Sequence, residues 1–317
     1  MALRELVTGL AKAELHLHLE GTLEPELAFA LAARNGVSLP YAGVAALRRA
    51  YDFADLQSFL DLYYACMAVL RTAEDFRDLA AAYLDRARAD GVVRAEVFFD
   101  PQEHTARGVP LAEVVAGLSR AAQESVAAGG PQVAFIACAV RHRGPAEALA
   151  MVESLEPHVG TVVGLGLDST ERGHPPRDYA RAFDAARGLG LRTVAHAGEE
   201  GPPAYVWEAL DVLGVERVDH GVRCVEDAAL VRRLAADGTP LTVCPLSNVR
   251  LRVVDDLRDH PLPRLLDAGV RVTLNSDDPA YFGGYVADNY VACAEAFGWS
   301  EADLTALARA SLDSVLR

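Results

Sequence analysis

Histidines and acidic residues stand at the carboxyl ends of several short apolar runs in this 317-residue sequence. The first run ends in His16-Leu17-His18, and residues i and i+2 of a strand point to the same face, so both imidazoles can share one ion. Three later runs end in His196–Glu199, Asp219–His220 and Asp277–Asp278. Burying so many ionisable groups without partners is costly. The pattern therefore predicts that these groups meet in one site.

Three imidazoles and one carboxylate suit a zinc ion that keeps an open position for water. The predicted ligands of one Zn2+ per chain are His16, His18, His196 and Asp277. Bound zinc lowers the pKa of its water towards about 7 and so supplies a nucleophile at neutral pH. Glu199 lies close to a ligand in the sequence and is predicted to act as a catalytic acid. His220 and Asp278 remain as catalytic or supporting groups.

These side chains need a scaffold that brings distant strand ends together. Most of the apolar runs are continuous rather than alternating, as strands covered on both faces are. The runs are Ala13–His18, Val92–Asp100, Val133–Val140, Val162–Ser169, Arg192–Glu199, Arg217–Gly221, Leu241–Asn248 and Arg271–Asp278. Helical patterns lie between them, among them Leu111–Ala128, Arg177–Leu189, Tyr205–Leu213, Asp227–Asp237 and Leu262–Ala268. We expect one α/β domain over residues 1–317, a (β/α)8 TIM barrel with its site at the carboxyl ends of the strands. An open doubly wound sheet is the alternative, but no GxGxxG follows the first run.

A long helical segment separates the first two runs. Its helical patterns are Pro25–Asn35, Gly43–Ala50, Leu56–Leu70 and Ala73–Asp90. An insertion after the first strand of a barrel lies at the catalytic mouth, so this segment is predicted to form a lid or a wall of the pocket.

The composition excludes several classes of function. With 30 basic and 45 acidic residues the formal net charge is −15, which makes non-specific binding to nucleic acid or anionic membrane unfavourable. Lys12 is the only lysine, so Schiff-base, pyridoxal-phosphate and P-loop chemistry would all have to use it. The five cysteines form no CxxC pair, and no signal peptide or membrane-spanning run is recognised. We expect a cytoplasmic protein.

The absence of lysine also bears on the number of metals. Many two-metal barrel hydrolases bridge their metals with a carbamylated lysine at the end of the fourth strand. The fourth run here ends in Gly166–Glu171, which contains no lysine. One metal is the simpler interpretation.

Five stretches of the sequence together resemble the adenosine/adenine deaminase family of zinc-dependent barrels. They are ELHLHLEGTLEP (Glu14–Pro25), HAGEEGPP (His196–Pro203), DHGVR (Asp219–Arg223), CPLSN (Cys244–Asn248) and NSDDPAYFGGY (Asn275–Tyr285). They follow the family's order and span nearly the whole chain. The PCxxC of cytidine-deaminase zinc sites is absent.

Two details are similar to the adenine branch of that family rather than the nucleoside branch. Glu20 occupies a position where nucleoside deaminases typically carry the Asp that meets the ribose, and DSTERGHPP (Asp168–Pro176) replaces their AGDE-like turn. The longer carboxylate and the altered turn are expected to fill the space of a ribose. We therefore expect Glu20 to lie at the substrate.

The resemblance implies zinc-dependent hydrolysis of adenine to hypoxanthine and ammonia, a step of purine salvage. Metal-bound hydroxide would attack C6, with His220 helping to remove the proton of the water. Glu199 would donate a proton to N1, and Asp278 would hold the N7 side. Backbone near Ser169, and Glu171 or Asp168, would face the N3/N9 edge.

Other functions remain open from the sequence. The substrate could be adenosine or another N9-substituted adenine such as aminodeoxyfutalosine, and a metal-dependent amide or ester hydrolase is the alternative of another class. The expected partner is a small 6-aminopurine, with neither nucleic acid nor membrane, and a homo-oligomer is open.

Several further residues have simpler interpretations. His104, His142, His158 and His260 are predicted to be solvated, whereas His174 is left open. Trp207, Tyr281 and Phe282 fit either the core or the pocket wall.

Overall fold

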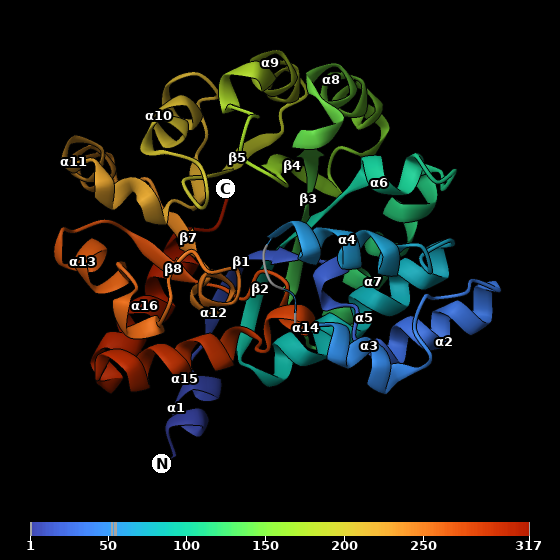
Figure 1. Cartoon of the computed structure of the whole chain (residues 1–317), viewed down its shortest axis with the longest axis horizontal. Helices are drawn as coiled ribbons and strands as arrows, with labels where there is room; N and C mark the ends of the chain where they lie inside the picture. The colour runs from blue at the N-terminus through green and yellow to red at the C-terminus, as the bar shows by residue number, and fades with distance from the viewer. Residues whose placement is uncertain (1, 52, 54–55, 317) are drawn as a thin grey trace.

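Eight parallel strands follow one another around a barrel, which confirms the predicted (β/α)8 TIM architecture (Figure 1). The computed structural model describes residues 2–51, 53 and 56–316. The strands are β1 (Lys12–His18), β2 (Val92–Phe99), β3 (Gln132–Val140), β4 (Val162–Asp168), β5 (Arg192–Ala197), β6 (Arg217–His220), β7 (Leu241–Val243) and β8 (Val272–Leu274), in the order β1 to β8. Every residue of β1 is buried, as expected for a strand covered on both faces.

The seam between the first and last strands is closed near the mouth of the barrel. The backbone N–H of His18 donates to Asp277 O at 2.9 Å, and the N–H of Asp277 donates to His16 O at 3.1 Å. Below them, the backbone N–H of Leu15 donates to the side-chain oxygen of Asn275 at 2.8 Å. The ring of strands thus closes through the backbone of predicted metal ligands.

Helices surround the barrel, with α8 to α11 along one side in Figure 1. The helices are α1 (Leu3–Gly9), α2 (Pro25–Asn35), α3 (Val44–Ala50), α4 (Leu56–Met67), α5 (Ala73–Ala89), α6 (Pro101–Thr105), α7 (Leu111–Ala127), α8 (Pro145–Ser154), α9 (Ala180–Gly188), α10 (Pro203–Asp211), α11 (Ala228–Asp237), α12 (Pro245–Arg250), α13 (Leu262–Asp267), α14 (Pro279–Phe282), α15 (Val286–Phe297) and α16 (Glu301–Asp313). Short 3-10 turns are η1 (Glu20–Thr22), η2 (Arg141–Arg143), η3 (Glu156–His158), η4 (Pro176–Tyr179), η5 (Val222–Glu226) and η6 (Leu257–Asp259). Helix α16 packs against both β1 and β8 and so covers the seam.

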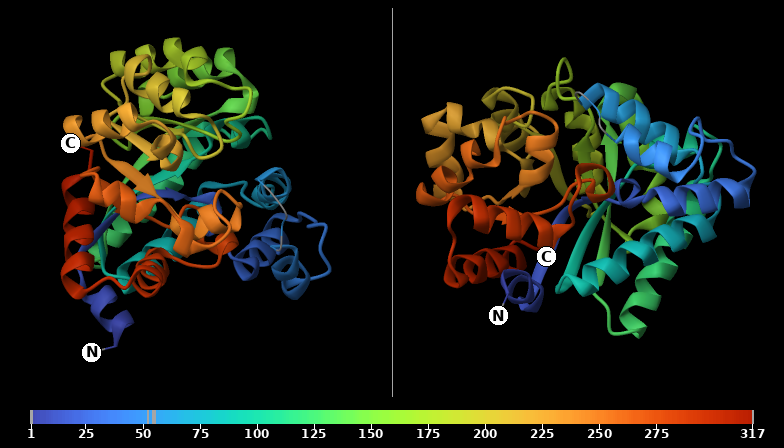
Figure 2. Two further views of the ribbon diagram at one scale, coloured as in Figure 1. Left: turned by 60° about the vertical axis from the view of Figure 1, so that its left-hand side comes forward. Right: turned by 60° about the horizontal axis from the view of Figure 1, so that its bottom comes forward.

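The long insertion forms helices α2 to α5, as the sequence predicts. Its helix ends follow local rules: α2 begins with Pro25 in its first turn and ends at Gly36, whose φ is +63°, a conformation that favours glycine. At α5, Thr72 and Asp75 form a capping box. In the left view of Figure 2 the first of these helices, drawn in blue, project from the barrel body.

Several strands end before the residues that the sequence predicts. The predicted β4, β5 and β6 end at Ser169, Glu199 and Gly221, whereas the observed ones end at Asp168, Ala197 and His220. The residue after each of these strands has left-handed backbone, with φ of +69° at Ser169, +76° at Gly198 and +70° at Gly221. A left-handed residue cannot continue a strand.

None of the helices in the described part of the chain combines the length and the apolar character that crossing a membrane requires.

Candidate active site

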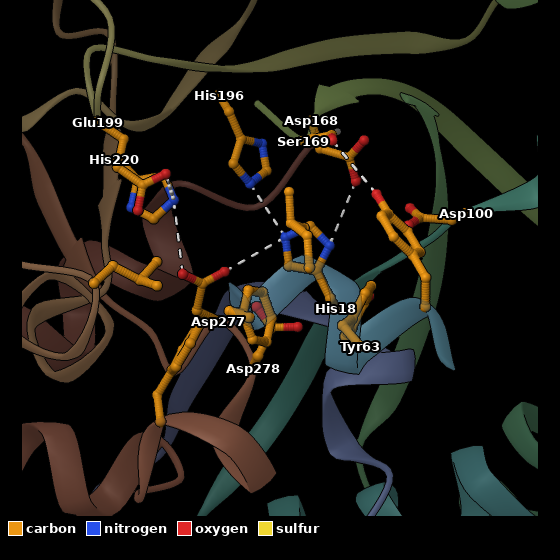
Figure 3. A pocket seen from close by; sticks show the side chains of 15 residues that line it. His18, Tyr63, Asp100, Asp168, Ser169, His196, Glu199, His220, Asp277 and Asp278 are labelled. Carbon is orange, nitrogen blue, oxygen red and sulfur yellow. Dashed lines mark hydrogen bonds and ion pairs between the residues drawn. The ribbon is translucent and has the colours of Figure 1, made fainter. Parts of the chain in front are cut away.

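The four predicted metal ligands converge at the mouth of the barrel, although β1, β5 and the turn after β8 supply them. Figure 3 shows three of them, His18, His196 and Asp277. His16 Nε2 lies 3.1 Å and His18 Nε2 3.4 Å from Asp277 Oδ1. His18 Nε2 lies 3.1 Å from His196 Nε2. The donor atoms of all four residues lie within 4.8 Å of one another, and all four residues are buried.

This donor set fits a zinc ion. Ligand atoms bonded at 2.0–2.1 Å to a tetrahedral ion lie about 3.3 Å apart, close to the 3.1 and 3.4 Å observed between Asp277 Oδ1 and the two imidazoles of β1. His16 Nε2 is buried and makes no hydrogen bond to any described residue. A cation would provide a partner for this nitrogen. It would also provide one for the Nε2 atoms of His18 and His196, which face each other at 3.1 Å.

Groups outside the cluster fix the orientation of its members. His16 Nδ1 lies 3.0 Å from Thr242 Oγ1, and that hydroxyl donates to Asp219 Oδ1 at 2.7 Å. The Asp277 carboxylate accepts a hydrogen bond of 2.6 Å from Ser247 Oγ. Such partners set ring orientation and raise the basicity of metal ligands.

Glu199 is held at the end of β5 by a loop that wraps around Glu171. The Glu171 carboxylate accepts hydrogen bonds from the backbone N–H of Gly198 at 3.0 Å, Glu199 at 2.9 Å and Gly201 at 3.0 Å. The Glu199 side chain itself lines the pocket. Burial, with the negative charge of Asp277 next, raises the pKa of the Glu199 carboxyl well above its usual value. This shift favours the protonated form of Glu199, the form that an acid role requires.

His220 is the end of a chain of hydrogen bonds whose direction is set by a backbone amide. The N–H of Leu262 donates to His260 Nδ1 at 3.1 Å, so the proton of neutral His260 lies on Nε2. His260 Nε2 lies 3.1 Å from Asn248 Oδ1, and Asn248 Nδ2 lies 3.3 Å from His220 Nδ1. His220 thus carries its proton on Nε2, which lies 3.6 Å from Glu199 Oε2 and 3.7 Å from Asp277 Oδ2. Burial and the neighbouring His16 lower the pKa of His220 to about 3, so the ring is neutral.

Asp278 points into the pocket beside Asp277 (Figure 3). It stands at the cap position of α14 but makes no capping hydrogen bond, and its Oδ1 has no hydrogen-bond partner in the described chain. Burial and Asp277 raise its pKa well above the usual value. The chain passes very close to it, since a Cβ at Gly21 would lie 2.7 Å from Asp278 Cα.

Helix α4 forms one wall of the pocket, as expected for part of the insertion. The wall residues from this helix are Phe59, Leu60, Tyr63 and Tyr64, with Leu251 and Phe282 from later segments. Ser169 also lines the pocket, and its hydroxyl lies 3.4 Å from Tyr64 Oη. Of the three aromatic residues that fitted either the core or the pocket wall, Phe282 thus lies in the wall. Tyr281 is instead buried beside Tyr51, and Trp207 Nε1 donates to Asp227.

Two predicted substrate contacts have other partners in the structure. The Glu171 carboxylate is occupied by the three amides of the Glu199 loop. Glu20 Oε1 lies 2.6 Å from His104 Nε2 and accepts from the backbone N–H of Asp100 at 3.2 Å. Neither carboxylate lines the pocket. His174 also lies outside this lining, where its carbonyl accepts from Arg141.

The prediction that His104 and His260 are solvated is wrong. Both are buried, with 0% and 3% of their surface exposed, because His104 pairs with the buried Glu20 carboxylate and His260 with Asn248. The sequence places both histidines at helix ends or in loops, and such positions do not reveal whether the side chain points to solvent or into the core.

Sequence reasoning gave no function to one acidic residue of the pocket wall, Asp100. It follows the second strand, so its place at a strand end was the available signal, but it precedes Pro101 and resembles an ordinary helix cap.

Comparison with known proteins gives one consistent assignment. The model of the adenosine deaminase family matches residues 11–316. The chain is 62% identical to an adenine deaminase of Streptomyces coelicolor over 302 residues, 95% of this chain and 89% of the relative. The crystal structure of an adenine deaminase from Arthrobacter aurescens superimposes with a TM-score of 0.95 at 53% identity, covering 96% of this chain and 94% of that one. An amidohydrolase from Burkholderia ambifaria with bound zinc gives 0.89 at 30% identity, over 99% of this chain and 88% of that one.

Proposed function

The chain belongs to the adenosine deaminase family, and from that membership we propose that it is an adenine deaminase. Water replaces the exocyclic amino group at C6, so that adenine and water give hypoxanthine and ammonia, a reaction of purine salvage. The observation that carries the proposal is the convergence of the four-donor cluster, the buried Glu199 carboxyl and the unpartnered Asp278 oxygen on one pocket. The relatives named adenine deaminase support the choice of substrate.

The metal fits the donor set described above. His16, His18, His196 and Asp277 would hold one zinc ion, which the donor chemistry and the zinc-containing relative support. When bound, zinc lowers the pKa of a water molecule and supplies the nucleophile.

Glu199 acts on the ring nitrogen next to the reacting carbon. Burial and the neighbouring Asp277 raise the pKa of its carboxyl, which favours the protonated form, and donation of that proton to N1 lets the ring accept electrons as C6 becomes tetrahedral. General acid catalysis of this kind contributes about 10²- to 10⁴-fold. The Glu171 carboxylate serves this step by holding the backbone of the Glu199 loop.

His220 orients the attacking oxygen. Because Asn248 occupies Nδ1, the neutral ring presents Nε2–H to the pocket. A donor at this place holds a lone pair of the oxygen and leaves another lone pair directed at C6. The sequence had suggested proton removal by His220, and the hydrogen-bond chain instead supports a donor.

Asp278 recognises the N7 side of the purine. In the tautomer with hydrogen on N9, N7 is an acceptor, and a carboxyl group kept protonated by burial can donate to it. The carboxyl is free to do so because it does not cap α14.

Ammonia release from a panel of 6-aminopurines tests the proposal. Zinc-loaded protein is incubated with adenine, adenosine, 9-methyladenine and N6-methyladenine, and kcat/KM is determined for each. We expect adenine to be the best substrate and hypoxanthine the product. Absence of ammonia from every compound would exclude a deaminase, and preference for adenosine would exclude the free base as the substrate.

A further inference from the structure

A pair of buried carboxyl groups faces the pocket, and the steps described so far leave it without a task. Asp100 follows β2 and Asp168 is the last residue of β4. Both line the pocket, and they are 2% and 3% exposed. In Figure 3 they lie on one side of His18, whereas Glu199 and His220 lie on the other. The pocket thus has an acidic end opposite the proposed proton donor.

Asp100 does not serve as a helix cap. It occupies the cap position of α6, yet its side chain makes no capping hydrogen bond, although an aspartate there normally stabilises a helix. Its side chain lines the pocket instead, and the buried Oδ1 atom has no hydrogen-bond partner among the described residues. An unsatisfied buried oxygen costs free energy unless a ligand satisfies it.

Asp168 stands beside Asp100 on this wall. One carboxylate oxygen of Asp100, one of Asp168 and one ring nitrogen of His18 lie within 4.8 Å of one another. Asp168 Oδ2 also lies 3.6 Å from His18 Nδ1, on the far side of that ring from the metal cluster. The unpartnered Oδ1 of Asp100 is therefore an acceptor on the pocket wall, and its neighbour Asp168 is in contact with a predicted metal ligand.

The chemistry of adenine identifies a matching donor. N1 and N7 flank C6, and the edge on the other side of the purine carries N3 and N9–H. Once Glu199 meets N1 and Asp278 meets N7, the N9–H donor is left for the remaining wall. A nucleoside has no hydrogen on N9 and carries a bulky group there.

We propose that Asp100 is a specificity-determining residue that accepts a hydrogen bond from N9–H of the free base, with Asp168 as its positioning residue. The inference rests on the proposed deamination of adenine and on the purine orientation given there. An N9-substituted adenine would be a poor substrate for two reasons. It has no N9–H to donate to Asp100, and its substituent would collide with this wall of the pocket. A site built around a substrate N–H discriminates strongly against analogues that lack it.

A second cation is the competing interpretation of the same atoms. His18 Nδ1, Asp100 and Asp168 offer one donor atom each within 4.8 Å. Because His18 Nε2 faces the four-donor cluster, a cation on Nδ1 would require the ring to lose its remaining proton and bind two ions. We therefore favour the substrate interpretation, and metal content becomes an outcome of the test.

The test compares Asp100→Ala and Asp100→Asn with the wild type. Asparagine can donate its amide N–H to Asp168 and keep an oxygen towards N9, whereas alanine has neither group. In Asp100→Ala we expect kcat/KM for adenine to fall about 10- to 100-fold, with less than about a threefold change for 9-methyladenine. Asp100→Asn should retain the preference of the wild type for adenine. Melting curves confirm that both variants are folded.

Calorimetric binding of purine and 9-methylpurine to the zinc-loaded protein provides a measurement that does not depend on turnover. The wild type and Asp100→Asn should prefer purine, and Asp100→Ala should lose that preference. Wild-type protein that binds purine but releases no ammonia from adenine would refute the proposed function and leave this comparison decisive. An equal loss for both ligands in Asp100→Ala would overturn the role of Asp100. Two metals per chain, with one lost in both variants, would assign the pair to a cation instead.

Discussion

Asp277 and Glu199 show how the surroundings of a side chain shift the pKa of two buried carboxyl groups in opposite directions. Burial alone raises the pKa of both, but at Asp277 the neighbouring imidazoles, His16 first among them, outweigh burial and hold the pKa below its usual value. Glu199 has a negative neighbour in Asp277, so its pKa rises. These opposite shifts suit the two roles proposed for these groups, a charged metal ligand and a protonated acid.

Glu199→Gln should separate these tasks. The amide cannot donate a proton in the required way, so kcat for adenine is expected to fall by about 10²- to 10⁴-fold, while zinc content stays at the wild-type level. Glu200→Gln is the matched control, because the neighbouring Glu200 lies outside the pocket lining and within 3.7 Å of Arg172. Normal turnover in Glu199→Gln would refute the acid role.

The proton on His220 can be moved without touching the ring. In Asn248→Asp a carboxylate would accept from His220 Nδ1–H and leave Nε2 bare, whereas Asn248 now favours Nε2–H. We expect 15N spectra of the histidines to report this tautomer change and kcat to fall by about 10²-fold or more. Asn248→Ala removes the bond without forcing the other tautomer and should be milder. An unchanged tautomer in Asn248→Asp would contradict the proposed chain of hydrogen bonds.

His260 links the same chain to the pH dependence of stability. Burial lowers its pKa to about 4 from an ordinary 6.5, so between these values the unfolded chain binds a proton that the folded protein does not. The free energy of unfolding should therefore fall as the pH drops from 6.5 to 4, by an amount on the order of 3 kcal/mol from this group. Urea unfolding of the wild type and His260→Asn across this range should show converging stabilities at acid pH. Parallel curves would show that His260 does not contribute.

At the scale of elements, the tight contact between η1 and the turn after β8 positions Asp278. In Gly21→Ala the new Cβ would lie 2.7 Å from Asp278 Cα, so the turn has to move. A displacement of about 1 Å can cost about 10²-fold in rate, and we expect kcat/KM for adenine to fall by about 10- to 100-fold. Gly9→Ala is the control, since a Cβ there meets no atom within 4 Å. Equal activities of the two variants would show that the contact is tolerant.

The sequence predicts the existence of the elements better than their ends. Continuous apolar runs reveal all eight strands, because strands buried on both faces need no polar alternation. The predicted Leu241–Asn248 strand ends at Val243 because Pro245 begins α12. The last strand ends at Leu274 rather than Asp278, where the side chain of Asn275 replaces a backbone partner. Where a side chain takes the place of a backbone hydrogen-bond partner depends on residues that are distant in the sequence, so the end of such a strand cannot be predicted locally.

The same limit applies to the site. The convergence of His16, His18, His196 and Asp277 could be predicted because residue types that bind metals are rare at strand ends without a shared purpose. Partners such as Asp100 and His260 have common types in common places, and only the fold brings them to the pocket wall or to Asn248.

At the scale of the molecule, the metal would join the first, fifth and last strands. Removal of zinc by a chelator should lower the melting temperature, since a ligand present at 1,000 times its Kd stabilises by about 4 kcal/mol. Asp277→Ala should melt at the same temperature with and without zinc, and His158→Ala, in η3, should retain the shift. A wild-type melting temperature that does not respond to zinc would argue against a bound ion at the seam.

The seam between β1 and β8 also has a consequence for folding: the barrel has to close before the four-donor cluster can be complete. His18 and Asp277 share a backbone hydrogen bond, yet they stand near opposite ends of the chain, and contacts between such distant segments form slowly because a large loop must close first. The four-donor cluster cannot be complete until that loop has closed. A half-folded barrel therefore has no complete centre, and hydrolytic competence arises together with the finished ring of strands.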